Sequence, residues 1–70
     1  MLITELGRCI KARRNTLRIN RPDLAEMAEI SLNTLYKIET GKVNPTVKVI
    51  NKLARVLGME LKLEVKKPKL

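Results

Sequence analysis

Residues 21–40 read RPDLAEMAEISLNTLYKIET, which is the pattern of two short helices separated by a tight turn. Asn20 stands directly before Arg21 and Pro22, the order of a helix N-cap followed by a proline in the first turn. Ser31 can cap a second helix, and Gly41 suits the left-handed position that follows a helix. We therefore expect one short helix that starts at Arg21 and another over about residues 32–40.

The side chains within these segments fit a packed pair of helices. Two short helices that meet at a steep angle need a small residue at their contact, and Ala25 fits that position. Four aliphatic residues fit the anchors of the second helix, and the last two are three positions apart: Leu24, Ile30, Leu35 and Ile38. The pattern predicts a helix-turn-helix, in which the second helix enters the major groove of DNA, although ordinary helical bundles also contain such pairs.

Two further helices flank this pair. One apolar stripe predicts a helix from Ile3 to about Leu17, with inward positions at Ile3, Leu6, Ile10 and Leu17. Another predicts a helix from about Val47 to Leu57, stopped by Gly58, with one face made of Val47, Ile50, Leu53, Ala54 and Leu57. We expect a mainly α fold in which residues 1–58 form a four-helix DNA-binding domain.

The hydrophobic period changes after Gly58. Four apolar residues alternate with charged ones, which predicts a half-buried strand over residues 59–65: Met59, Leu61, Leu63 and Val65. A lone strand leaves its backbone groups unpaired, so we expect it to pair with the same strand of a second subunit in a homodimer. A fifth helix is the alternative, since Leu, Lys and Glu are good helix formers; residues 66–70 would form a basic tail.

The net charge and the low aromatic content restrict the classes of molecule that the chain can bind. The 70 residues include 15 Lys and Arg against 7 Asp and Glu, and the net charge of +8 attracts polyanions, although a lysine-rich surface without a specific partner has the same charge. Tyr36 is the only aromatic residue, which argues against single-strand binders that stack bases on several rings.

Composition also restricts the chemistry. With one cysteine and no histidine, the chain has no internal disulfide, too few ligands for zinc and no activated nucleophile, so we expect no metal, no cofactor and no enzyme activity. Cys9 is interpreted as a small packing residue. No apolar run reaches the roughly 20 residues of a membrane span and no leader is visible, so we expect a cytoplasmic, nucleoid-associated protein.

Three segments, Asp23–Glu26, Leu35–Lys42 and Asn44–Pro45, resemble the phage repressor/Cro family. The resemblance extends over about residues 6–58, and it implies a DNA-binding domain that acts as a dimer on palindromic operators. The C-terminal strand resembles a narrower branch, the antitoxin repressors of the Hip persistence module, which implies a kinase-like toxin as a candidate partner.

The resemblance also implies roles for individual residues. It places four residues against base edges, namely Leu32, Asn33, Tyr36 and Lys37, where Asn33 can bond adenine, Lys37 can bond guanine and Leu32 can touch a thymine methyl. Phosphate contacts are expected from Arg21, Ser31, Thr34, Lys42 and Asn44. An ordinary solvated helix face is the alternative interpretation of each position.

The resemblance further implies an ion pair between Arg14 and Glu39. Two departures from the family pattern concern the motif itself, because Arg21 stands where glutamine is usual and Glu29 stands where glycine is usual. We expect Arg21 to contact phosphate more strongly and to bridge less to the third helix, and we expect Glu29 to be strained if its backbone is left-handed.

These observations favour a transcriptional repressor that binds double-stranded DNA as a homodimer on an inverted-repeat operator. The more specific version of this hypothesis is the antitoxin of a toxin-antitoxin operon. The alternative is a protein-interaction module that binds and neutralises an acidic partner.

Overall fold

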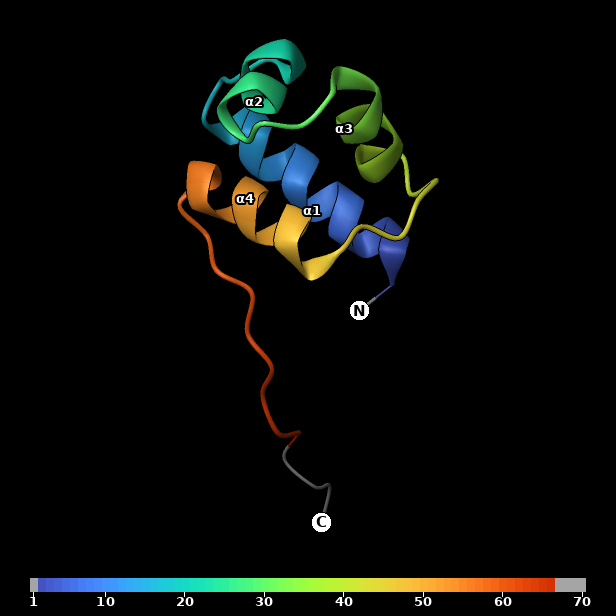
Figure 1. Ribbon diagram of the computed structural model, residues 1–70. Helices are drawn as coiled ribbons and strands as arrows, with labels where there is room; N and C mark the ends of the chain where they lie inside the picture. Colours follow the sequence, from blue (N-terminus) through green and yellow to red (C-terminus); the bar gives the residue numbers. More distant parts are fainter. Residues whose placement is uncertain (1, 67–70) are drawn as a thin grey trace.

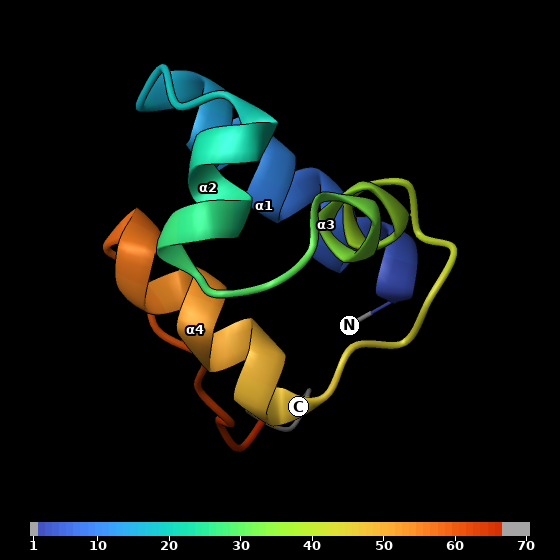
Figure 2. The same cartoon turned by 45° about the horizontal axis from the view of Figure 1, so that its top comes forward.

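The computed structural model describes residues 2–66 and contains four helices: α1 (Ile3–Thr16), α2 (Arg21–Met27), α3 (Leu32–Glu39) and α4 (Val47–Leu57) (Figure 1). Both α1 and α2 pack against α3 and against α4. In Figure 2, α3 is seen nearly along its axis while α2 is seen from the side, so the two helices meet at a steep angle. The predicted four-helix architecture is confirmed.

Three helices begin at side-chain caps. Asn20, Ser31 and Thr46 have extended backbones, and their side-chain oxygens accept hydrogen bonds from the backbone N–H groups of residues 23, 34 and 49 at 2.9, 3.0 and 3.2 Å. Each cap satisfies one of the amide groups that a helix leaves unpaired at its start. These local bonds explain why the predicted starts of α2, α3 and α4 are correct.

All four helices end in the same kind of turn. One or two residues past the end of each helix, the backbone is left-handed, with φ of 57° at Arg18, 56° at Glu29, 71° at Gly41 and 67° at Gly58. The next residue then donates its backbone N–H to a carbonyl five positions earlier, at 3.1, 3.0, 2.8 and 2.8 Å respectively. This pattern satisfies carbonyls that the helix leaves unpaired. Glycine therefore occupies two of the four turns, and residues with long side chains occupy the other two.

The core lies between the four helices. Five large side chains are less than 2% exposed: Leu24, Leu35, Ile38, Leu53 and Leu57. Ile10, Ala25 and Ala28 complete the buried set, so Ala25 is buried as its predicted role as a small packing residue requires.

Gly7 allows α1 to approach α3 closely. A Cβ atom built on Gly7 would lie 2.3 Å from the carbonyl oxygen of Ile38 and 2.9 Å from that of Glu39. Both obstacles are backbone atoms of α3, so any side chain at this position would push α3 away from α1. This contact could not be predicted from the sequence, because a glycine inside a helical pattern carries no sign of which backbone lies opposite.

Several predicted core positions are wrong. Ile3 and Leu17 are 38% and 39% exposed, because the inward face of α1 is formed instead by Gly7, Ile10 and Arg14. Val47 is 61% exposed, since it is the first residue of α4 and lies at the end of the helix. Cys9 is exposed and is not a packing residue of the core.

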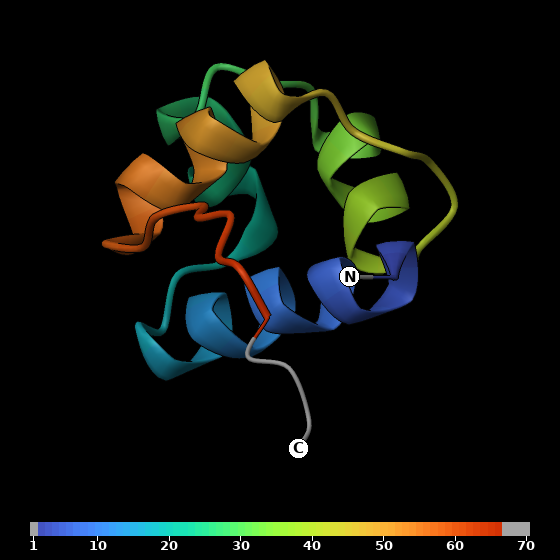
Figure 3. The ribbon, with the colours of Figure 1, turned by 90° about the horizontal axis from the view of Figure 1, so that it is seen from below.

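The C-terminal segment begins inside the fold and then leaves it. Met59, which is one of the predicted dimerisation residues, donates its backbone N–H to the carbonyl of Ala54 and packs against the core of its own chain. Met59 and Leu61 line a hollow of about 130 Å³ together with residues of α1 and α4. Figure 3 shows the ribbon of this segment leaving the end of α4. Leu63 and Val65 are fully exposed.

The described residues 2–66 contain no strand, so the strand predicted over residues 59–65 is absent from the single chain. The physical reason is that a strand needs a ladder partner, and the four helices of one chain supply none. Residue 66 is exposed, and the rest of the predicted tail lies outside the described residues.

Candidate nucleic-acid interface

The two sides of α3 differ sharply in burial. Leu35 and Ile38 are buried against the core, while all four predicted base-contacting residues lie exposed on the other side: Leu32, Asn33, Tyr36 and Lys37. Ser31 caps α3, and its hydroxyl donates to the hydroxyl of Thr34 at 2.7 Å. The helix is therefore fixed from its start and on its buried side, and its polar side is free to meet a ligand.

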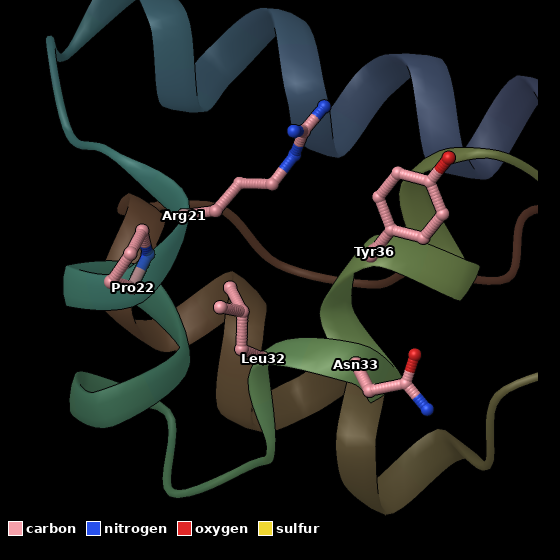
Figure 4. Close-up of a pocket in the computed structure, with 5 residues that line it drawn as sticks. All are labelled: Arg21, Pro22, Leu32, Asn33 and Tyr36. Carbon is pink, nitrogen blue, oxygen red and sulfur yellow. The ribbon is translucent and has the colours of Figure 1, made fainter.

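An open hollow lies beside this exposed side, between the start of α2 and α3 (Figure 4). Its volume is about 570 Å³, and five residues line it: Arg21, Pro22, Leu32, Asn33 and Tyr36. In Figure 4, Leu32 lies between the two helices at the base of the hollow, and the amide of Asn33 points away from α2. The hollow thus joins three of the predicted base-contacting residues to the predicted phosphate-contacting Arg21.

Two cations lie over the single aromatic ring. The guanidinium of Arg21 is 5.6 Å from the centre of the Tyr36 ring, and the Lys42 ammonium group is 5.4 Å from it. Both distances permit a cation–π attraction, which at exposed sites contributes about 0.5–1 kcal/mol. The ring is therefore held beside the hollow by contacts from α2 and from the turn after α3.

The carboxylate of Glu39 forms ion pairs with two arginines, Arg14 and Arg21. Its side chain is fully buried at the end of α3. The carboxylate accepts hydrogen bonds from Arg14 Nε at 2.7 Å, Arg14 Nη2 at 3.0 Å and Arg21 Nε at 2.9 Å. The predicted Arg14–Glu39 pair is confirmed. Arg14 also donates to the carbonyl of Ile19 at 3.0 Å, so this network connects α1, the loop after it, α2 and α3.

The network changes the ionisation of Glu39. Burial by itself raises the pKa of this carboxyl group, but hydrogen bonds from Arg14 and Arg21 and their positive charges lower it further than burial raises it. The pKa of Glu39 therefore lies below its usual value of 4.5, and the group is ionised at neutral pH.

The expectation that Arg21 bridges less to the third helix is wrong. Arg21 forms an ion pair with Glu39, the last residue of α3, and its side chain is 34% exposed. The sequence contained no local sign of this pair, because the two residues are 18 positions apart. Of its five N–H donors only one is used in this bond, so the others remain available to a phosphate.

The remaining predicted phosphate contacts surround α3. Ser31 and Thr34 lie at its start and are already bonded to each other, while Lys42 and Asn44 are exposed in the turn before α4. Sequence reasoning missed Pro22, which lines the hollow; its position next to Arg21 at the start of α2 is the only signal that could have identified it.

Over residues 2–66, no three His, Cys, Asp or Glu side chains gather in a way that could hold a metal ion. None of the helices in this range has the length and apolar character required to cross a membrane.

Comparisons with known proteins agree with this geometry. Residues 10–63 match the family model described as helix-turn-helix. A "Putative HTH-type transcriptional regulatory protein" of Methanococcus vannielii is 34% identical over 55 residues, which cover 79% of this chain and 17% of the relative. A protein of the same description from Methanococcus maripaludis is 33% identical over 55 residues, which again cover 79% of this chain and 17% of the relative.

The solved structures show the same fold. The clp gene regulator ClgR from Corynebacterium glutamicum superposes with a TM-score of 0.81 at 22% identity, covering 84% of this chain and 63% of that one. The chain spans about one sixth of the length of the two curated relatives. The family match covers most of the chain and includes α2 and α3, and the chain therefore belongs to the helix-turn-helix family.

Proposed function

We propose that this protein is a transcriptional regulator that reads a specific sequence of double-stranded DNA by inserting the exposed side of α3 into the major groove. The observation that carries the proposal is the contrast on α3. Buried aliphatic residues anchor one side, and the exposed side carries three hydrogen-bonding side chains, those of Asn33, Tyr36 and Lys37, beside Leu32. The net charge of +8 supports it, because each phosphate neutralised by Lys or Arg releases condensed counterions.

We assign direct reading of bases to Asn33 and Lys37. An asparagine can bond both N6 and N7 of adenine, and a lysine can reach O6 and N7 of guanine. Arg21, Lys42 and Asn44 would hold the sugar-phosphate backbone and fix the orientation of α3, with weaker contributions from Ser31 and Thr34.

We further propose that two copies pair through residues 60–66 as antiparallel strands centred on Leu63. In this register Glu60 faces Lys66 of the second copy and Lys62 faces Glu64, while the apolar side chains meet on the opposite side. A parallel arrangement in register would place like charges opposite each other, which destabilises a sheet. The 3.3 Å contact between Lys62 Nζ and Glu60 Oε1 supports this alternation, because both side chains lie on one side of the segment.

Such a dimer would present two copies of α3 to one face of the duplex. In helix-turn-helix dimers the two half-sites lie about 34–36 Å apart, which is one helical turn of DNA. The preferred target is therefore an inverted repeat, and binding there would repress a promoter that it overlaps.

A narrower version of the proposal makes the protein the antitoxin of a toxin-antitoxin pair. It is supported by a second basic surface on α4, where Lys48, Lys52 and Arg55 line a hollow of about 320 Å³ together with Asn51. An acidic toxin could bind this surface while α3 binds DNA. Co-expression with the product of the adjacent gene, followed by co-purification, tests this version.

Selection from a random duplex library tests the main proposal. We expect enrichment of an inverted repeat, and we expect Lys37→Ala to lose about 1–3 kcal/mol of binding to that repeat while losing little on random DNA. Fluorescence anisotropy at several salt concentrations measures both affinities. Recovery of no preferred sequence, or equal losses on both kinds of DNA, would contradict base reading by α3.

A further inference from the structure

The hollow of about 130 Å³ beside α1 and α4 is apolar and only partly covered in the single chain. Two residues of α1, two of α4 and two of the segment after α4 form most of its lining: Leu6, Cys9, Ile50, Ala54, Met59 and Leu61. None of these side chains is fully buried, and the thiol of Cys9 is exposed. We call this feature the α1–α4 hollow; the packing of one chain leaves it incomplete.

The size of the α1–α4 hollow limits what can occupy it. Binding sites for small molecules usually have volumes of about 300–1,000 Å³, so this hollow is too small for an effector of ordinary size. A dry apolar cavity of about 150 Å³ holds a single benzene molecule, which is similar in size to one large aliphatic side chain. The occupant that fits the hollow is therefore a single apolar side chain.

The segment after α4 carries apolar side chains that its own chain leaves in solvent. Leu63 and Val65 are fully exposed, and Figure 1 shows their segment leaving the four helices. Alternate residues of an extended segment point to the same side, so these two share a face with Leu61. A ribbon of only two strands is marginally stable in water and has to pack its apolar face against another element. The proposed pair of strands therefore requires a surface to cover.

The antiparallel register centred on Leu63 determines which residue reaches the α1–α4 hollow. In this register Val65 of the second copy lies directly opposite Leu61, with the two Cβ atoms about 4.5–5.5 Å apart on the same face of the ribbon. Since Leu61 lines the hollow, Val65 of the second copy lies at its edge. Leu63 instead meets Leu63 of the second copy at the two-fold axis.

We propose that the α1–α4 hollow of each subunit is filled by Val65 of the other subunit, so that the apolar face of the ribbon packs against α1 and α4 of both. The inference rests on the dimer given under the proposed function. It adds a specific binding site, in which one subunit receives a side chain of the other and the thiol of Cys9 becomes shielded. This contact would attach the ribbon firmly to both DNA-binding domains.

The reactivity of Cys9 measures whether the hollow is filled. Cys9 is the only cysteine of the chain, so the thiol reagent DTNB reports on this position alone. As the concentration of the native chain increases, we expect the reaction rate per chain to fall in proportion to the fraction of monomer, because only the monomer exposes the thiol. Sedimentation velocity gives the monomer fraction in the same solutions.

Two substitutions of opposite size test the contact itself. Val65→Ala should raise the dimer dissociation constant about 200-fold, which corresponds to about 0.8 kcal/mol for each of the four methyl groups removed from the dimer. Cys9→Leu occupies the hollow from α1 and should raise the constant about tenfold, because Val65 no longer fits. In the double variant the leucine fills the space that the valine leaves, so the loss should be smaller than the product of the two single losses.

Ala12→Leu is the matched control for Cys9→Leu. It adds an apolar side chain of the same size at an exposed position of α1 that does not line the hollow, and it should dimerise as the native chain does. Circular dichroism verifies that each variant is folded.

The outcomes separate this contact from the dimer on which it depends. If the native chain is monomeric at every concentration, the proposed pairing of residues 60–66 fails and the inference fails with it. If the native chain forms a dimer in which Cys9 reacts as fast as in the monomer, or if the two single losses multiply, only the contact with Val65 is rejected. Protection of Cys9 that does not depend on concentration would show that one chain covers its own hollow, which also overturns the inference. No DNA enters these measurements, so their failure leaves base reading by α3 unaffected.

Discussion

Glu39 connects three helices through one carboxylate. Two oxygen atoms receive three hydrogen bonds from Arg14 and Arg21, and no solvent reaches the side chain. A buried ion pair contributes little relative to an apolar replacement of the whole pair, but the loss of one partner leaves the other charge buried and uncompensated. Glu39 is the shared partner, so its removal affects both arginines.

Replacing Glu39 by alanine should cost about 3–5 kcal/mol of the free energy of unfolding, because it leaves Arg14 buried without a counter-charge. A single core of this size supplies about 3–5 kcal/mol in total, so Glu39→Ala should be largely unfolded at 25 °C. Glu39→Gln keeps hydrogen-bond acceptance and should lose less. Urea denaturation followed by circular dichroism measures both; an Ala variant as stable as the native chain would show that the network does not hold α3.

Acid should destabilise the fold through the same group. The pKa of Glu39 is lowered in the folded protein, so its ionised form is favoured there more than in the unfolded chain. The resulting stability is fully present above pH 4.5 and is lost as pH falls below that value through the folded pKa. The free energy of unfolding, measured from pH 7 to pH 3, should fall more steeply in the native chain than in Glu39→Gln, and parallel curves would contradict this assignment.

Single residues were the hardest level to predict from the sequence. The Arg14–Glu39 pair was implied only by resemblance to a family, and the Arg21–Glu39 pair was missed because a side chain that replaces a usual glutamine was interpreted by its charge alone. Gly7 was missed for a related reason, since its role depends on the carbonyl groups of Ile38 and Glu39 on another helix. Such contacts are set by how helices cross, which local spacing does not specify.

The helices themselves were easier to predict, because their boundaries depend on short-range chemistry. Asn20, Ser31 and Thr46 bond to amide groups only three residues away, and Gly41 and Gly58 adopt the left-handed backbone that glycine permits. The turn at Arg18 could not be predicted in this way, because arginine gives no sign of a left-handed backbone.

Two of the four terminal turns should accept glycine with a gain in stability. Glu29 has φ of 56° and Arg18 has φ of 57°, a conformation that costs a side-chain-bearing residue about 1–2 kcal/mol. We expect Glu29→Gly and Arg18→Gly each to raise the free energy of unfolding by about 0.5–1 kcal/mol, after the larger backbone entropy of glycine in the unfolded chain is subtracted.

Thermal denaturation of both glycine variants checks this expectation. Glu29→Ala is the matched control, since it removes the side chain without relieving the backbone, and it should gain nothing. A gain in Glu29→Ala equal to that in Glu29→Gly would locate the strain in the glutamate side chain instead.

At the scale of the whole molecule, the charges of residues 60–66 predict how two copies pair. Lys62→Glu would place like charges opposite Glu64 of the second copy at two symmetric points, and we expect the dimer to dissociate about tenfold more readily. Adding Glu64→Lys restores opposite charges in the antiparallel register and should restore the native affinity. Sedimentation velocity measures the dimer dissociation constant of the native chain, of Lys62→Glu and of the double variant.

The truncated chain ending at residue 58 provides the control for this experiment. It keeps all four helices, and it should be monomeric at the concentrations where the proposed dimer of the native chain forms. A tight dimer of the truncated chain, or a double variant as weak as Lys62→Glu alone, would show that subunits meet elsewhere or in another register.

The burial of Glu39 also determines whether a mutation near it unfolds the protein or alters its binding. Because α3 is held by the same carboxylate that keeps α1 and α2 together, a change that loosens its attachment unfolds the chain before it produces a tilted helix. Cells degrade unfolded chains, so under the proposed function a degraded copy would occupy no promoter. Damage at this position should therefore silence the protein without redirecting it to wrong genes, whereas changes on the exposed side of α3 are free to alter its choice of target.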